Sequence, residues 1–245
     1  MKMLAFSVRN GKEMLRDKLT LFFGLGFPLV ILLLLSAIQS HVPVALFSID
    51  RLTPGVAVFG LSFLSLFSGL LIAKDRSSAL MLRLRSAPLR ASDFILGYLL
   101  LPLPMAVAQS LVCFIAAFAL GLPVTLNVLL TLVVLLPADV VFIALGLICG
   151  SLFNDRQVGG VCGALLTNLS AWLSGTWFDL SLIGGAFEAI AGLLPFYHAV
   201  EAGRAALCGQ LSGLFPHLWW VIGYGAVLLL LAVVVFRQQL CTDKT

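Results

Sequence analysis

Long apolar runs recur along the whole chain and limit what it can fold into. A helix needs about 20 apolar residues to cross the hydrocarbon core of a bilayer. Six runs reach that length, at 19–38, 54–73, 94–118, 127–150, 158–178 and 218–236. A further stretch, 180–194, is too short to span and contains Glu188. The pattern predicts an all-α integral membrane protein with six transmembrane helices in a single transmembrane domain, 1–245.

Composition agrees with this prediction. Hydrophobic residues make up 61% of the 245 positions and charged residues 11%, and the mean hydropathy is +1.11. Soluble domains carry about 25% charged residues. A chain with so few charges could not cover a soluble surface, so we expect membrane lipid to surround it, with no nucleic-acid partner.

The basic residues are unevenly placed between the spans. If the N-terminus is inside, the cytoplasmic pieces hold 13 of the 15 Lys and Arg residues, in 1–18, 74–93, 151–157 and 237–245. Only Arg51 and Arg204 fall outside. This positive-inside bias predicts a multi-pass protein with both termini cytoplasmic and 180–216 outside. A seven-span arrangement would place Arg237 and Lys244 outside, and it would require Glu188 to lie in the membrane.

The N-terminal piece, 1–18, can form a helix along the inner membrane interface. Leu4, Val8 and Leu15 share one of its faces, and charged residues occupy the others. An interfacial helix has this amphipathic character. The alternative is an ordinary positively charged flank that sets topology.

The loop 74–93, between the second and third spans, is too long for a minimal turn. Ser77 or Ser78 can cap a short helix there, and Pro88 would end it. An exposed, partly apolar helix suggests docking onto a partner protein, through Arg76, Leu80, Arg83, Leu84 and Arg85. The alternative is again a topology signal.

Catalytic and nucleotide-binding motifs are missing from the sequence. It has no G-x-x-x-x-G-K-[ST], the loop that holds ATP phosphates, and no H-E-x-x-H or G-x-S-x-G. Only Asp139 lies near the middle of a span, whereas carriers have several such acids. We expect no catalysis by this chain alone. A lipid-processing enzyme, a secondary carrier and a structural membrane scaffold are the alternatives, and an enzyme would have to use the outer cluster of Glu188, His198, Glu201 and Arg204.

Weakly polar residues lie along two of the expected spans. They are Ser62, Ser65 and Ser68 in the second, and Thr167, Asn168, Ser170 and Ser174 in the fifth. Small residues allow close helix packing in lipid. The other interpretation is that these faces, with Asp139, line a substrate path or a dimer seam. We expect the Asn168 amide to point inward. Asp139 is either a polar group of the path or a gating contact, or it is a protonated or locally hydrogen-bonded structural acid.

Two local motifs resemble those of the permease subunits of ABC-2-type transporters. Residues 82–90, Leu-Arg-Leu-Arg-Ser-Ala-Pro-Leu-Arg, are similar to a family stretch that ends in Pro-Leu, with Gly97 following. Ser174-Gly175 also fits. The segment 194–207 is similar to the family's Pro…Tyr/His…acid-Ala…Arg segment, through Pro195, His198, Glu201 and Arg204. Ala79 and Leu82 depart from the family's frequent Gly and acidic residue.

The resemblance implies a division of labour. A separate ATP-binding cassette subunit would hold ATP and Mg and hydrolyse the ATP, and this chain would bind no cofactor. The 74–93 helix would be the coupling helix, 180–216 a re-entrant outer segment, and Pro195, His198, Glu201 and Arg204 an outer gate. A second permease copy, identical or different, would complete the path. The implied activity is export of an amphipathic or lipid-like substrate, a drug or a polysaccharide from a bacterial inner membrane.

Overall fold

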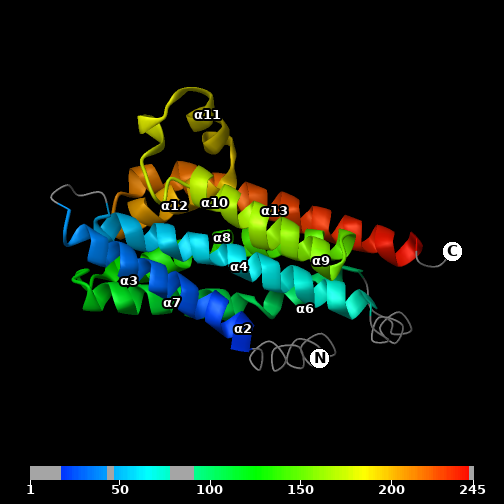
Figure 1. The fold of residues 1–245 in the computed structure, drawn as a ribbon. Coiled ribbons are helices and arrows are strands. Elements are labelled where there is room, and N and C mark those ends of the chain that lie inside the picture. Colours follow the sequence, from blue (N-terminus) through cyan, green and yellow to red (C-terminus); the bar gives the residue numbers. More distant parts are fainter. Residues whose placement is uncertain (1–17, 43–46, 78–90, 243–245) are drawn as a thin grey trace.

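A computed structural model of the chain describes residues 18–42, 47–77 and 91–242. Within those residues the regular structure is helical, without strands. The helices run side by side as one elongated bundle (Figure 1). Residues 1–17 of the expected 1–18 helix and most of the expected coupling helix, including Leu80, Arg83, Leu84 and Arg85, lie outside the described residues.

The helices follow the apolar runs of the sequence. The first run forms α2 (Lys18–Leu21), the π-helical η1 (Phe22–Gly26) and α3 (Phe27–Gln39) in direct succession. The middle runs form α4 (Ile49–Ser77), α6 (Ala91–Leu100), α7 (Leu103–Ala119) and α8 (Leu126–Leu152). The remainder forms α9 (Asp155–Val158), the π-helical η2 (Gly159–Leu166), α10 (Thr167–Leu173), the 3₁₀ turn η3 (Leu180–Leu182), α11 (Gly185–Leu193), α12 (Pro195–Leu207) and α13 (Leu211–Thr242).

Five helical stretches in the described part of the chain are long and apolar enough to cross a membrane. They are Phe22–Gln39, Ile49–Arg76, Phe94–Ala119, Leu126–Leu152 and Leu211–Gln239. The all-α integral membrane fold is therefore confirmed. The expected fifth span, 158–178, is not among the five. Its helical part ends early, at Leu173, and the continuous stretch from α9 to α10 that contains it also includes Arg156, Gln157 and Asn168. The six-span count remains a prediction.

Some helix boundaries differ from the expected ones. Helix α10 ends at Leu173, before the expected limit of 178, because the chain turns at Gly175 with φ +69°. Helix α13 begins at Leu211, inside the expected outer segment 180–216. The third expected span is two helices, α6 and α7, separated at Leu101–Pro102. Proline lacks the N–H that a continuous helix would need there.

Helix α4 lies at the centre of the bundle and packs against α3, α7, α8, η2 and α12. Its closest approach is to α8, where glycines bring the two backbones together. A Cβ added to Gly146 would collide with the carbonyl oxygen of Ser65, and one added to Gly150 with that of Gly69. Small residues permit such close packing in the absence of a hydrophobic driving force between helices.

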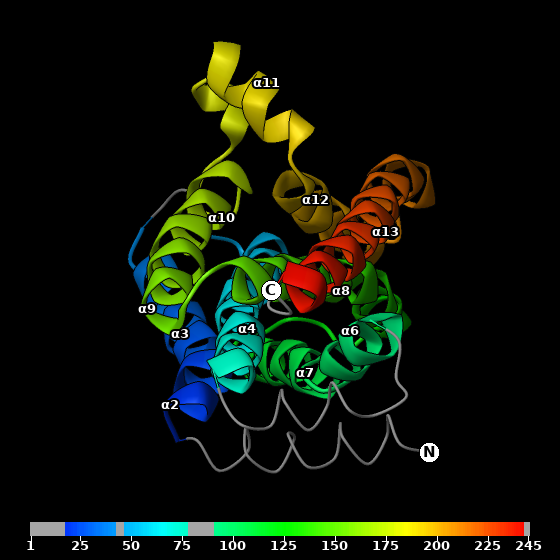
Figure 2. The same cartoon turned by 90° about the vertical axis from the view of Figure 1, so that its right-hand side faces the viewer.

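The bundle has two ends, which we name after residues found there. At the Ser77 end lie the end of α4, the beginning of α6, the end of α8, α9 and the end of α13 (Figure 1). The Gln39 end holds the end of α3, the beginning of α4 and α12. Helix α11 stands out from the bundle beyond α10 and α13, as Figure 2 also shows.

Candidate functional site

Helix α12 carries all four of the expected gate residues and lies against the bundle at its Gln39 end. It begins at Pro195, at the first helical position, where the missing N–H leaves no carbonyl unpaired. One face is buried against α4, α8 and α13, through Phe196, Ala199, Val200, Ala202, Gly203, Ala206 and Leu207. At Gly203 a Cβ would come within 3.0 Å of the Pro54 side chain. This face holds α12 directly against α4.

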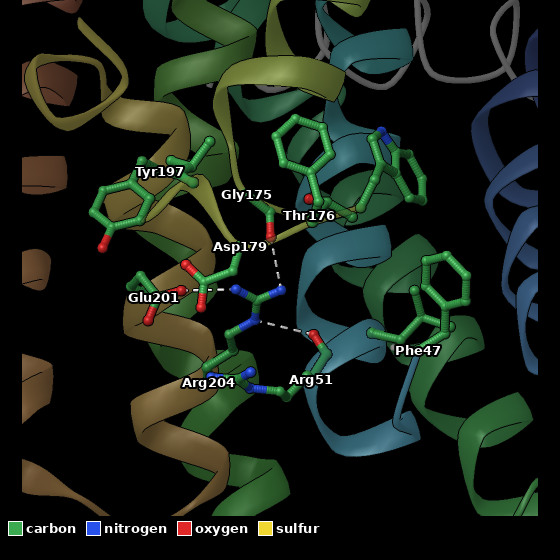
Figure 3. Close-up of a pocket in the computed structure, with 12 residues that line it drawn as sticks. Phe47, Arg51, Gly175, Thr176, Asp179, Tyr197, Glu201 and Arg204 are labelled. Carbon is green, nitrogen blue, oxygen red and sulfur yellow. Dashed lines mark hydrogen bonds and ion pairs between the residues drawn. The ribbon is translucent and has the colours of Figure 1, made fainter. Parts of the chain in front are cut away.

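Arg204 joins three parts of the chain. Its Nη1 donates to Glu201 Oε1 at 2.7 Å within α12. Its Nε donates to the backbone carbonyl oxygen of Arg51 in α4 at 3.1 Å, and its Nη2 to that of Gly175 at 2.9 Å. The side chain is 16% exposed. Figure 3 shows the guanidinium between these acceptors. We call this arrangement the Arg204 clamp.

A cavity of about 160 Å³ lies beside the Arg204 clamp. Its walls come from the beginning of α4, the turn after α10, and α12 (Figure 3): Phe47, Arg51, Leu52, Gly175, Thr176, Trp177, Phe178, Asp179, Leu180, Tyr197, Glu201 and Arg204. It is therefore bounded by two arginines, two carboxylates and several aromatic rings. Such walls can hold a polar group of an amphipathic molecule beside an apolar one.

The charged groups of this cavity influence one another. Asp179 Oδ1 accepts from Ser181 N at 3.2 Å and Ser181 Oγ at 2.9 Å. These bonds, with Arg51 and Arg204 nearby, lower the pKa of Asp179. Burial, with the charges of Glu201 and Asp179, raises the pKa of Tyr197. At neutral pH the cavity therefore presents an ionised Asp179 and a protonated Tyr197.

The turn after α10 is fixed to α4. Thr176 Oγ1 donates to the Gly55 carbonyl oxygen at 3.3 Å, and it lies 2.7 Å from Ser174 Oγ. Both side chains are buried. Ser174, expected in the path or seam, thus holds the turn that forms the cavity wall. Sequence reasoning missed Thr176 and Asp179, which have no distinctive spacing.

His198 and Pro195 do not line this cavity, although they were expected beside Glu201 and Arg204. His198 Nδ1 lies 2.7 Å from His217 Nδ1 of α13, and its Nε2 lies 2.8 Å from the Gly192 carbonyl oxygen. Burial lowers the pKa of His198. Tyr224 Oη also donates to the Leu193 carbonyl oxygen at 2.6 Å. These contacts fix the corner between α11 and α12 to α13.

Most of the expected path residues are buried inside this one chain. Ser62, Ser65 and Ser68 of α4 and Ser170 of α10 are fully buried. Ser62 and Ser68 donate to carbonyl oxygens of their own helix, and Thr167 donates to the Cys162 carbonyl oxygen. The serines of α4 therefore lie where helices pack together.

Asn168 contradicts the expectation that its amide points inward. The side chain is exposed on the surface of the chain, and Nδ2 donates to the Ala164 carbonyl oxygen at 2.8 Å. A bond to the carbonyl four residues earlier satisfies one amide donor without a neighbouring helix. In the single chain Asn168 thus faces outward.

Asp139 lies in the core of the bundle on α8, 1% exposed. Among the described residues, its Oδ1 has no hydrogen-bond partner. Buried polar atoms without partners are costly, and Asp139 shares this feature with side-chain atoms of Ser65, Gln109, Ser110 and Ser170. The locally hydrogen-bonded alternative has no support at this oxygen.

Arg76 was expected to contact a partner protein, but its guanidinium is engaged within the chain. Nη1 donates to the carbonyl oxygens of Gly150, at 3.1 Å, and Ser151. These carbonyls belong to the last turn of α8, whose negative dipole end favours a cation. Arg76 therefore holds the ends of α4 and α8 together.

A family model for ABC-2 type transporters matches residues 1–208. The chain belongs to this family. Its members are transmembrane transport subunits without an ATPase domain of their own, and they typically work with an ATP-binding subunit. This ABC-2 chain is thus a permease subunit and a multi-pass membrane protein. No curated protein matches it.

Proposed function

We propose that this ABC-2 permease subunit exports an amphipathic or lipid-like substrate, a drug or a polysaccharide from the cytoplasm. The family match carries the proposal. The chain has no phosphate-binding loop, so ATP and Mg would sit on a separate ATP-binding cassette subunit. In this arrangement the Ser77 end is cytoplasmic, in a bacterial inner membrane, and the Gln39 end faces outward.

The work of ATP hydrolysis enters through the segment 74–93. This segment joins α4 to α6, so displacing it can move both helices. Leu80 and Leu84 would be shielded from water by a docked subunit, and full burial of a leucine contributes about 1.5–3 kcal/mol. Arg83 and Arg85 would pair with acidic groups on that subunit.

A second permease copy completes the path. Helices η2 and α10 support this part of the proposal. A Cβ added to Gly159 or Gly160 would meet nothing within 4 Å, and Asn168 is exposed nearby. An amide facing lipid is unfavourable, and small residues let another helix approach closely. A second copy that packs on this face would cover the two glycines and the Asn168 amide.

The outer gate is the Arg204 clamp and the cavity beside it. The clamp holds α12, the beginning of α4 and the turn after α10 in one arrangement. Separating these elements would open the cavity. Export would therefore proceed through release of the clamp, with the polar part of the substrate passing the charged walls.

Replacing Leu84 with Asp tests the energy-coupling part of the proposal. We expect the variant to insert normally, because the change lies outside the apolar runs. Its co-purification with the ATP-binding subunit should fall, as should transport per ATP hydrolysed. Arg83→Glu should act in the same direction.

Arg237→Gln is the matched control, because Arg237 is exposed near the end of α13 and outside the proposed docking segment. Unchanged complex formation and transport in both Leu84→Asp and Arg83→Glu would show that 74–93 is only a topology signal. A neighbouring reading frame with a G-x-x-x-x-G-K-[ST] motif would support the division of labour.

A further inference from the structure

The last turn of α4 is tied to α6 through a buried hydrogen bond. Tyr98 Oη donates to Asp75 Oδ2 at 2.7 Å. Tyr98 is fully buried and Asp75 is 8% exposed. A buried hydrogen bond is electrostatically stronger than one exposed to water, because the local dielectric is low. The bond therefore links the two helices on either side of 78–90 at a fixed point.

The same turn of α4 is tied to α8 through the neighbouring residue. Arg76 donates to the carbonyl oxygens of Gly150 and Ser151. The last carbonyls of a helix have no partner within it, so an arginine there completes the helix end. Two adjacent residues of α4 thus reach two different helices.

The position of these contacts relates them to energy coupling. Asp75 and Arg76 are the two residues before Ser77, the last residue of α4, which is followed by the segment 78–90. Tyr98 lies in α6, the helix that follows that segment. Helix α8 has no direct chain connection to the segment, so Arg76 supplies the link to it.

We propose that Asp75, Arg76 and Tyr98 form a coupling anchor. It passes displacement of 78–90 into α6 through the Asp75–Tyr98 bond and into α8 through Arg76. These are positioning residues, since they act on the helices and not on substrate. The proposal rests on the proposed function, in which an ATP-binding subunit moves this segment.

Hydrogen–deuterium exchange of the membrane-reconstituted complex tests the anchor without a known substrate. The complex, purified with its ATP-binding subunit, is compared without nucleotide and with ATP plus vanadate. In the natural sequence we expect nucleotide to change exchange in 78–90, in 91–100 and in 146–153. Tyr98→Phe should abolish the response in 91–100, and Arg76→Gln that in 146–153. The response in 78–90 should persist in both variants.

Tyr224→Phe is the matched control for Tyr98→Phe, because it removes a tyrosine hydrogen bond of similar length that joins α13 to the end of α11 and involves neither α4 nor α6. A double-mutant cycle adds Asp75→Asn. Because one bond joins the two residues, Asp75→Asn should have no further effect on 91–100 once Tyr98→Phe is present. If these residues had only a structural role, the variants would be less stable but would keep the nucleotide response in 91–100.

Two outcomes separate the possible failures. If nucleotide leaves 78–90 unchanged in the natural sequence, the proposed energy coupling fails and the anchor with it. If 78–90 responds but 91–100 and 146–153 respond equally in all variants, only the anchor is overturned.

Discussion

Arg204 Nε donates to the backbone carbonyl oxygen of Arg51, a residue 153 positions earlier in the chain. The same guanidinium holds Glu201 and the Gly175 carbonyl oxygen. One side chain therefore connects three elements of the bundle. This relationship joins the expected gate residues to parts of the chain that the gate motif does not include.

Removing the Arg204 clamp should destabilise the Gln39 end of the bundle. Arg204→Ala leaves Glu201 and two carbonyl oxygens without their donor, and such losses cost about 1–3 kcal/mol each when the group is buried. Since Glu201 is partly exposed, we expect the lower part of this range. The readout is the apparent unfolding temperature of the purified protein in detergent.

Arg51→Ala is the control for this prediction. The Arg51 side chain is exposed, and only its backbone accepts from Arg204. Its loss should cost no more than a surface ion pair, about 0–1 kcal/mol. If both variants lost equal stability, the charge in the cavity and not the hydrogen bonds of the clamp would account for the effect.

The contact of α4 with α8 should not tolerate a methyl group. Gly146→Ala and Gly150→Ala each place a Cβ against a backbone carbonyl oxygen of α4, where no side chain can move aside. Overpacking of this kind costs about 1–3 kcal/mol. We expect lower yields of folded protein and earlier unfolding by circular dichroism.

Gly223→Ala is the matched substitution. A Cβ there meets nothing within 4 Å, so the change should be neutral or slightly stabilising, because alanine favours helix. If Gly146→Ala behaved like Gly223→Ala, the close approach of α4 and α8 would be wrong.

Acidification should weaken the corner between α11 and α12. Burial, with His217 nearby, lowers the pKa of His198 below its ordinary value of 6.5, although the Gly192 carbonyl and Glu201 oppose the shift. Below pH 6.5 the unfolded chain then binds more protons than the folded one, so stability falls as pH falls. The stability that depends on neutral His198 should be fully present above about pH 7.

His198→Gln tests this pH dependence, because it removes the titrating group. We expect the difference in unfolding temperature between pH 7.5 and pH 5.5 to be smaller in the variant than in the natural sequence. An identical pH dependence would show that His198 does not contribute to it.

Topology can be tested with the chain's own cysteines. Cys208 is exposed just after α12, and Cys241 is close to the end of α13. In variants that keep one cysteine each, a membrane-impermeant maleimide added to intact cells should label Cys208 and not Cys241. Labelling of Cys241 alone would contradict the proposed orientation.

Sequence patterns determined the local features of the candidate site. Glu201 and Arg204 lie three positions apart, a spacing that puts them on one helix turn, and they form a 2.7 Å ion pair. Their grouping with His198 was incomplete, because His198 turns toward His217 on α13 and away from the cavity. Positions three apart on a helix share a face only approximately, and the neighbouring helices decide what each side chain meets.

By itself the sequence determined that this chain is an all-helical membrane protein, because the bilayer requires long apolar runs whose backbone bonds close internally. It could not determine which helices meet, since spans apolar on every side leave no amphipathic face to indicate their neighbours. Only the tertiary structure joined Arg204 to Arg51, Asp75 to Tyr98, and Gly146 to Ser65. In lipid, such pairings depend on close packing of small residues and on a few polar bonds between distant segments, and neither has a period along the chain.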